Sequence, residues 1–332
     1  MMMTPEWLAH RYDEGNDAVH FVSAPRALRR SVPFLTDEYL EATDAPTIWK
    51  RGDALAAARG ASQTHFIFHS AYCCSTLLAQ AFDIPGAAHS LSEPQILNDM
   101  VGWRHRGGNP AEIGMVTDSA LQLLARPFVE GEATVIKPSN VVNGLATALL
   151  SIRPEARAVL LHAPLRLFLG SIARKGMWGR LWVRELLSRQ LAEGMVDLGF
   201  EPRDYLLHTD LQAAAVGWLA QHRVFSDMAR KWPDRIRTLD SETLVARPGE
   251  AFAALASLFG IALTEAQIAS TVADVFARDS KSGKAFASGQ RAADQTAAEA
   301  LHADEIEKVS SWAEAVAASA SIDMALPAPL LG

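Results

Sequence analysis

The sequence predicts an α/β fold in which a central parallel sheet is covered by helices on both faces. Short apolar strands alternate along the chain with segments of helical periodicity, and the strands are apolar enough to be buried on both sides. The predicted strands are residues 64–69, a segment ending at Glu93, and residues 133–137, 156–162 and 235–239. The 332 residues include 49% hydrophobic and 21% charged residues, which is typical of a globular protein with a substantial core.

Helical periodicity fills most of the intervals between these strands. The predicted helices are residues 76–82, a helix beginning near Pro94, and residues 143–152, 165–174, 179–232, 249–259, 264–276 and 292–318. Because residues 179–232 look wholly helical, we expect a helical insertion at about 176–232. Residues 278–291 are rich in Ser, Gly and Lys and are expected to form a loop. We predict one α/β domain, residues 61–332, on which an N-terminal extension with short helical stretches, residues 1–60, is packed.

Charge and hydropathy exclude several classes of protein. The chain carries 31 Lys and Arg against 38 Asp and Glu, and a net charge of −7 argues against a general nucleic-acid binder. We expect no membrane span, because no apolar run reaches 18 residues, and no signal peptide. The two cysteines, Cys73 and Cys74, are adjacent and lack the spacing of a zinc site. We therefore expect a cytoplasmic protein without a bound metal.

The first place to look for a ligand is the loop that follows the first strand of the sheet, because ligands bind at the carboxyl ends of parallel strands. This loop lies within HFIFHSAYCCSTLL, residues 65–78. Its small residues allow backbone N–H groups to approach a phosphate, and a helix beginning near Ser75 adds the hydroxyl groups of Ser75 and Thr76. The glycines and lysine of a Walker A loop are absent. The alternative is a plain strand–turn–helix in which Ser75 caps the helix.

Five segments, in order, resemble motifs of the sulfotransferase family. The segments are S-T-L-L at 75–78, L-S-E-P at 91–94, V-I-K-P at 135–138, the stretch 152–171 that contains H-A-P, and residues 235–260. The resemblance implies a P-loop NTPase-like three-layer fold with a helical insertion. It also implies transfer of a sulfonate from 3′-phosphoadenosine 5′-phosphosulfate (PAPS) to a hydroxyl or amine of a small-molecule or peptide acceptor.

The same resemblance implies a set of site residues. The donor would bind over residues 70–77, with the cofactor-binding positions Ser70, Tyr72, Cys73, Cys74, Ser75 and Thr76. The 3′-phosphate would bind near His162, Arg166 and Ser171, with Lys281 and Lys284 in a late basic loop. Glu93 resembles the general base, although a glutamate beside Pro94 also suits a helix start. Lys137 would bind the ligand or pair with Glu93. His69 would orient the donor or act as a satisfied strand-end histidine.

Two departures from the family pattern matter for the chemistry. Tyr72 stands where the family has a basic loop residue, and it carries no positive charge near neutral pH. His162 replaces the arginine that holds the 3′-phosphate. Cations that could compensate are Arg166, Arg174, Lys175, Lys281 and Lys284. The acceptor would enter under residues 176–232, where Trp178 and Trp182 either roof the pocket or pack in the core.

The sequence keeps two rival functions open. One is phosphoryl transfer from a nucleotide, which the missing Walker lysine and the missing magnesium-binding aspartate disfavour. The other is a degenerate fold that binds a nucleotide or a partner without turnover. The acceptor and the oligomeric state have no signature in the sequence.

Overall fold

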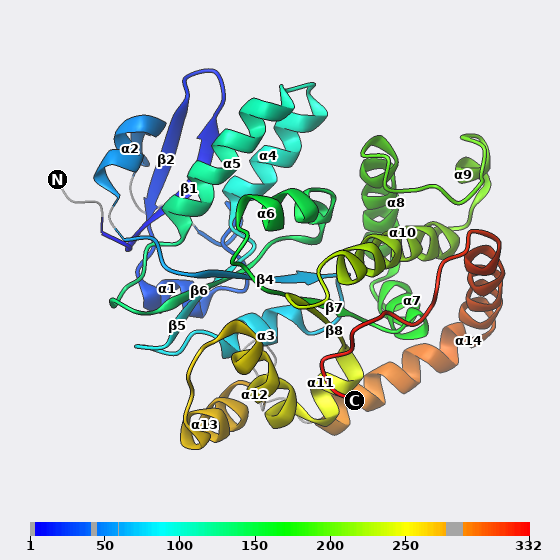
Figure 1. Cartoon of the computed structure of the whole chain (residues 1–332). Coiled ribbons are helices and arrows are strands. Elements are labelled where there is room, and N and C mark those ends of the chain that lie inside the picture. The colour runs from blue at the N-terminus through cyan, green and yellow to red at the C-terminus, as the bar shows by residue number, and fades with distance from the viewer. Residues whose placement is uncertain (1–3, 41–44, 59, 277–287) are drawn as a thin grey trace.

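The computed structural model describes residues 4–40, 45–58, 60–276 and 288–332, and its centre is a five-stranded parallel sheet (Figure 1). The strands are β4 (Thr64–His69), β5 (Ala88–Ser92), β6 (Ala133–Lys137), β7 (Ala158–His162) and β8 (Ile236–Asp240). They are ordered β5-β6-β4-β7-β8, and every neighbouring pair is parallel. The predicted α/β fold with a central parallel sheet is therefore confirmed. Because β5 and β6 lie on one side of β4 and β7 and β8 lie on the other, the carboxyl end of β4 is the switch point, which is where ligands bind in open α/β sheets.

Helices lie on both faces of this sheet and beyond one of its edges (Figure 1). They are α3 (Ser75–Ala81), α4 (Gln95–His105), α5 (Pro110–Leu124), α6 (Ala146–Ile152), α7 (Leu165–Arg174), α8 (Gly176–Ala192), α9 (Asp204–Leu207), α10 (Asp210–Lys231), α11 (Ser241–Ala246), α12 (Pro248–Phe259), α13 (Glu265–Val275) and α14 (Ser288–Ser319). A 3₁₀ helix, η1 (Asn140–Leu145), precedes α6. In the described part of the chain, no helix is both long enough and apolar enough to cross a membrane.

Alternate side chains of each strand enter two hydrophobic clusters on opposite faces of the sheet. On β4, Ile67 packs with helices α3, α7, α10, α12 and α14, whereas Phe66 and Phe68 pack with α4, α5 and α6. All three side chains are fully buried. This two-residue alternation with both faces covered explains why the centre of β4 is continuously apolar in sequence.

The N-terminal extension contains an antiparallel sheet that the sequence did not predict. Strands β1 (Trp7–Asp13), β2 (Ala18–Ser23) and β3 (Thr47–Lys50) pair in the order β1-β2-β3, and two short helices, α1 (Arg26–Ser31) and α2 (Arg51–Ala57), accompany them. Leu8 and Phe21 are buried in the same cluster as Phe66 of β4. The extension and the main domain thus share one hydrophobic core, which is why its short strands are stable.

The helical insertion is interrupted, so the prediction of a wholly helical segment at 179–232 was wrong. Helix α8 ends at Ala192, and residues 193–203 lie outside helices before the short helix α9 begins. Gly194, two residues past the end of α8, has a φ angle of +68°, a conformation that ends a right-handed helix. Helix α10 then begins at a capping box formed by Thr209 and Gln212.

The end of the predicted loop 278–291 is helical in the structure. Residues 277–287 lie outside the described residues, while helix α14 already begins at Ser288 rather than at the predicted 292.

Candidate functional site

A cavity of about 250 Å³ lies at the carboxyl ends of β4, β5 and β6, next to the predicted loop. Its lining residues are Phe34, His69, Ala71, Tyr72, Cys73, Cys74, Ser75, Thr76, Glu93, Lys137, Ser139, Asn140, Val141, Lys175, Trp178 and Trp182. They come from the N-terminal extension, the loop after β4, the ends of β5 and β6, η1, and the junction of α7 with α8. The structure therefore gathers most of the predicted site residues around one cavity at the switch point of the sheet.

The loop after β4 has an unusual backbone. Ala71, Tyr72 and Cys74 all have positive φ angles, of 70°, 53° and 63°. A left-handed conformation costs a residue with a Cβ atom about 1–2 kcal/mol, and such conformations persist mainly at functional sites. Cys74 thus adopts a backbone conformation that glycine adopts without strain and that a residue with a Cβ atom rarely adopts.

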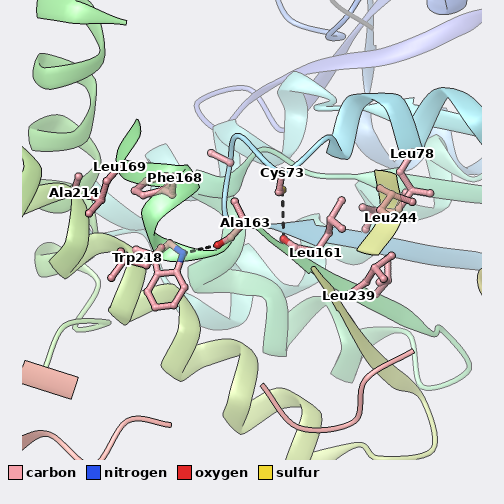
Figure 2. Close-up of a cluster of buried hydrophobic side chains, with 14 of the residues drawn as sticks. Cys73, Leu78, Leu161, Ala163, Phe168, Leu169, Ala214, Trp218, Leu239 and Leu244 are labelled. Carbon is pink, nitrogen blue, oxygen red and sulfur yellow. Dashed lines mark hydrogen bonds between the residues drawn. The ribbon is translucent and has the colours of Figure 1, made fainter. Parts of the chain in front are cut away.

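Side chains on the buried side of this loop bind the end of β7. The backbone N–H of Ser70 donates to the Leu161 carbonyl at 3.1 Å, and the Ser70 hydroxyl accepts from the N–H of Ala163 at 3.2 Å. The thiol of Cys73 lies 3.5 Å from the Leu161 carbonyl oxygen (Figure 2). Burial raises the pKa of Cys73 to about 12, so this residue is a neutral thiol. Ser70, which was predicted to bind the cofactor, lies outside the cavity lining and joins the loop to the end of β7.

Glu93 and Lys137 form an ion pair on the wall of the cavity. In the register of β5 against β6, Ser92 is opposite Lys137, so Glu93 follows directly beside it. The Lys137 ammonium donates to Glu93 Oε1, and the N–H of Glu93 donates to the Lys137 carbonyl at 2.6 Å. The side chain of Lys137 is 1% exposed and that of Glu93 is 16% exposed. The predicted pairing of Lys137 with Glu93 is present, and the carboxylate faces the cavity.

His69 fixes the start of the loop beside this pair. The N–H of Ala71 donates to His69 Nδ1 at 3.1 Å, which places the ring proton of the neutral imidazole on Nε2. His69 Nε2 lies 3.1 Å from the Pro138 carbonyl oxygen and 3.8 Å from Glu93 Oε1. With these contacts, His69 connects the loop after β4 to the end of β6.

Aromatic rings also line the cavity. The ring centroids of Trp178 and Trp182 are 6.5 Å apart with nearly parallel planes, and Tyr72 meets Trp182 edge-on at 5.6 Å. Burial raises the pKa of Tyr72 to about 12, so the phenol is neutral at physiological pH. Trp178 is 61% exposed and lines the cavity, which makes a packing role in the core untenable for that residue.

Three residues predicted to bind the 3′-phosphate are not part of this cavity lining. His162 packs edge-on against His222 with centroids 5.1 Å apart, and burial lowers its pKa, so it is neutral at pH 7. Arg166 forms an ion pair with Glu307 of α14, which packs along α7. Ser171 lies on the same helix, outside the lining. The sequence did not show that the C-terminal helix covers α7. Lys281 and Lys284 lie outside the described residues.

Sequence reasoning missed one cavity residue from the N-terminal extension. Phe34 lines the cavity because the next residue, Leu35, is bonded to the end of β5. The N–H of Leu35 donates to the Ser92 carbonyl at 2.7 Å, and the N–H of Gln95 donates to the Leu35 carbonyl at 3.1 Å. The Lys137 ammonium lies 4.8 Å from the centre of the Phe34 ring. Nothing in the local sequence signals this role, because it depends on where the extension crosses the end of β5.

Ser139, Asn140 and Val141 were also missed as cavity residues. They follow Lys137 and Pro138 directly, so their position after a predicted strand end was an available signal. Among the described residues, no group of three or more His, Cys, Asp or Glu side chains is arranged to hold a metal ion.

No protein-family model matches the chain, and no curated protein matches it either. Among solved structures, it is similar to sulfotransferase STF9 from Mycobacterium avium, with 13% identity and a TM-score of 0.44 over 77% of this chain and 79% of that one. It is also similar to the sulfotransferase domain of the curacin biosynthetic pathway, with 12% identity and a TM-score of 0.40 over 68% and 81% of the two chains. A third similar structure is the sulfotransferase domain of the Synechococcus PCC 7002 olefin synthase, with 13% identity and a TM-score of 0.40 over 70% of this chain and 84% of that one.

All three solved structures are sulfotransferases. This is the family that the sequence motifs resemble. At identities of 12–13% and TM-scores of 0.40–0.44, these likenesses assign no catalytic role to any residue of this chain.

Proposed function

We propose that this chain is a sulfotransferase-like enzyme that transfers a sulfonate from PAPS to a hydroxyl or amine acceptor. The observation that carries the proposal is the Glu93–Lys137 pair, which faces the loop after β4 across one cavity. A sulfonate transfer needs a base for the acceptor proton and positive or N–H groups around the oxygens that gain charge. The cavity holds a carboxylate, ammonium groups and the backbone of a tight loop, so it contains both kinds of group.

In the proposed reaction, the acceptor oxygen or nitrogen attacks the sulfur atom of the donor. The new bond from the acceptor to sulfur forms as the bond from sulfur to the bridging phosphate oxygen breaks. The electron pair of the broken bond stays on the phosphate of 3′-phosphoadenosine 5′-phosphate (PAP), and the acceptor proton passes to Glu93. Lys137 positions the carboxylate, and the loop of residues 71–76 would hold the phosphosulfate.

Several features of the cavity suit this reaction. Trp178 and Phe34 give apolar contacts on which the body of a small-molecule or peptide acceptor can rest while its hydroxyl or amine reaches Glu93. Cys73 and Cys74 are unbridged thiols, which fits a reducing compartment, and we expect the reaction in the cytoplasm. The net charge of −7 fits a small-molecule donor better than a nucleic acid.

Calorimetric titration with PAP, with ATP in parallel, tests the donor. We expect micromolar binding of PAP, about −8 kcal/mol, and much weaker binding of ATP. Tighter binding of ATP than of PAP would instead favour phosphoryl transfer. If neither nucleotide binds, the proposed donor is refuted.

Turnover tests the role of Glu93. In an acceptor screen that follows conversion of PAPS to PAP, Glu93→Gln should lower kcat by about 10²–10⁴-fold with PAP affinity retained. Glu185→Gln on α8 is the matched control, because Glu185 is exposed and pairs with Arg189 one turn away. PAP binding without turnover of any acceptor would favour the degenerate binding protein.

A further inference from the structure

The cavity contains one cation whose charge is not balanced within it. Its ionisable side chains are Glu93, Lys137, Lys175, His69, Tyr72 and two cysteines. The charges of Glu93 and Lys137 cancel in their ion pair. Tyr72 is neutral, because burial raises its pKa to about 12. The net positive charge available to a bound anion therefore comes from Lys175.

Lys175 is held at the cavity by a tight junction between α7 and α8. Its backbone N–H donates to the Ile172 carbonyl at 3.1 Å, and Gly176 follows with a φ of +59°. A Cβ atom on Gly179 would lie 2.7 Å from Lys175 Cβ and 2.8 Å from the Ile172 oxygen, so a larger residue would force the two helices apart. The ammonium lies 6.0 Å from the centre of the exposed Trp178 ring. The two glycines thus fix where Lys175 emerges.

Three arginines on the same two helices are paired with acids. Neither Lys175 nor its neighbour Arg174 forms such a pair among the described residues, and Lys175, unlike Arg174, lines the cavity. Arg166 pairs with Glu307, and Arg180 pairs with Glu305, both on α14. Arg184 pairs with Asp210 at the start of α10. Within the described ranges, no ion pair involves Lys175. An exposed cation that is kept unpaired at the mouth of a cavity is suited to an anionic ligand.

We propose that Lys175 supplies, from the junction of α7 and α8, the positive charge that a basic loop residue supplies in the family the motifs resemble. It would contact the phosphate and the bridging oxygen of the donor from the start of α8, which lies beside the loop that contains Tyr72. The proposal rests on the proposed function, because it names the group that meets the phosphosulfate. The charge is carried by a helix junction instead of the loop, which explains how an uncharged Tyr72 is compatible with a donor site.

Lys175→Met removes the charge and keeps an unbranched chain over Trp178. We expect PAP to bind about tenfold more weakly to this variant and about as tightly to Lys175→Arg. Adding Tyr72→Lys to Lys175→Met should recover most of the lost affinity, because the charge then stands on the loop. Arg189→Met, on an exposed and paired arginine of the same helix, is the control and should bind PAP like the wild type. Unfolding midpoints should be equal for wild type, Lys175→Met and Arg189→Met.

The outcomes separate the two proposals. If the wild type binds PAP and Lys175→Met binds it equally well, the role of Lys175 is refuted and the proposed function stands. If Lys175→Arg is as weak as Lys175→Met, the charge is not what matters, and the role is also refuted. If the wild type itself binds no PAP, the proposed function falls and the role of Lys175 falls with it.

Discussion

Removing the carboxylate of the Glu93–Lys137 ion pair should lower the free energy of unfolding more than removing the ammonium. The Lys137 side chain is 1% exposed and that of Glu93 is 16% exposed. In Glu93→Gln the ammonium stays buried without its counter-charge, with the Phe34 ring still 4.8 Å away. Leaving a buried charge unpaired costs about 3–5 kcal/mol, so we expect the free energy of unfolding to fall by that amount.

Lys137→Met should be the milder substitution. Its apolar side chain fills the volume of the lysine, and the remaining Glu93 carboxylate is partly exposed at the cavity, where water can reach it. We expect a loss of about 1–3 kcal/mol. The double variant should lose about 2–3 kcal/mol less than the sum of the two single variants, since neither charge is then left alone.

Urea unfolding followed by circular dichroism and by tryptophan fluorescence measures the three variants and the wild type. The control is Glu185→Gln, which removes one partner of an exposed pair and should leave the midpoint unchanged. Equal and additive losses for the two single variants would refute the reasoning, because they would show that Lys137 is solvated or paired elsewhere.

Three further predictions concern titration, cysteine reactivity and the cavity wall. Burial depresses the pKa of three histidines: His65 to about 4, His89 to about 3 and His222 to about 3. All three imidazoles are neutral in the folded protein. Their contribution to the free energy of unfolding is fully present above pH 6.5 and falls by up to about 1.4 kcal/mol per pH unit for each histidine as the pH drops towards its folded pKa. Tm measured against pH checks this, and a Tm that does not fall below pH 6.5 would show that the rings are solvated. Iodoacetamide should label Cys74 and leave the buried Cys73 unmodified, and bound PAP should slow the labelling of Cys74. Mass spectrometry measures both reactions, and fast labelling of Cys73 would contradict the anchored loop. Trp178→Ala should leave Tm unchanged, because the ring is 61% exposed, and should raise the acceptor KM, whereas an unchanged KM would exclude this ring from acceptor binding.

The sequence predicted the central sheet because strands that are buried on both faces have a recognisable local pattern, a short run rich in apolar residues. Each of the strands β4, β6, β7 and β8 lies at its predicted place, since a strand between two helix layers is rich in apolar residues. Glu93 was singled out by the resemblance of its segment to a sulfotransferase motif, and Lys137 by its place at the end of a predicted buried strand. Their contact follows from the register of β5 against β6, which places Ser92 opposite Lys137.

The tertiary structure decided what surrounds that edge. Phe34 reaches the cavity from an extension whose strands were not foreseen, because their stability comes from packing on β4 rather than from local pattern. Arg166 was predicted to bind a phosphate, yet it faces Glu307, since α14 packs on α7 across 141 residues of sequence. Lys175 lies in the cavity because two glycines let α7 and α8 approach. Contacts between distant segments depend on how helices stack, and no short sequence pattern records that stacking.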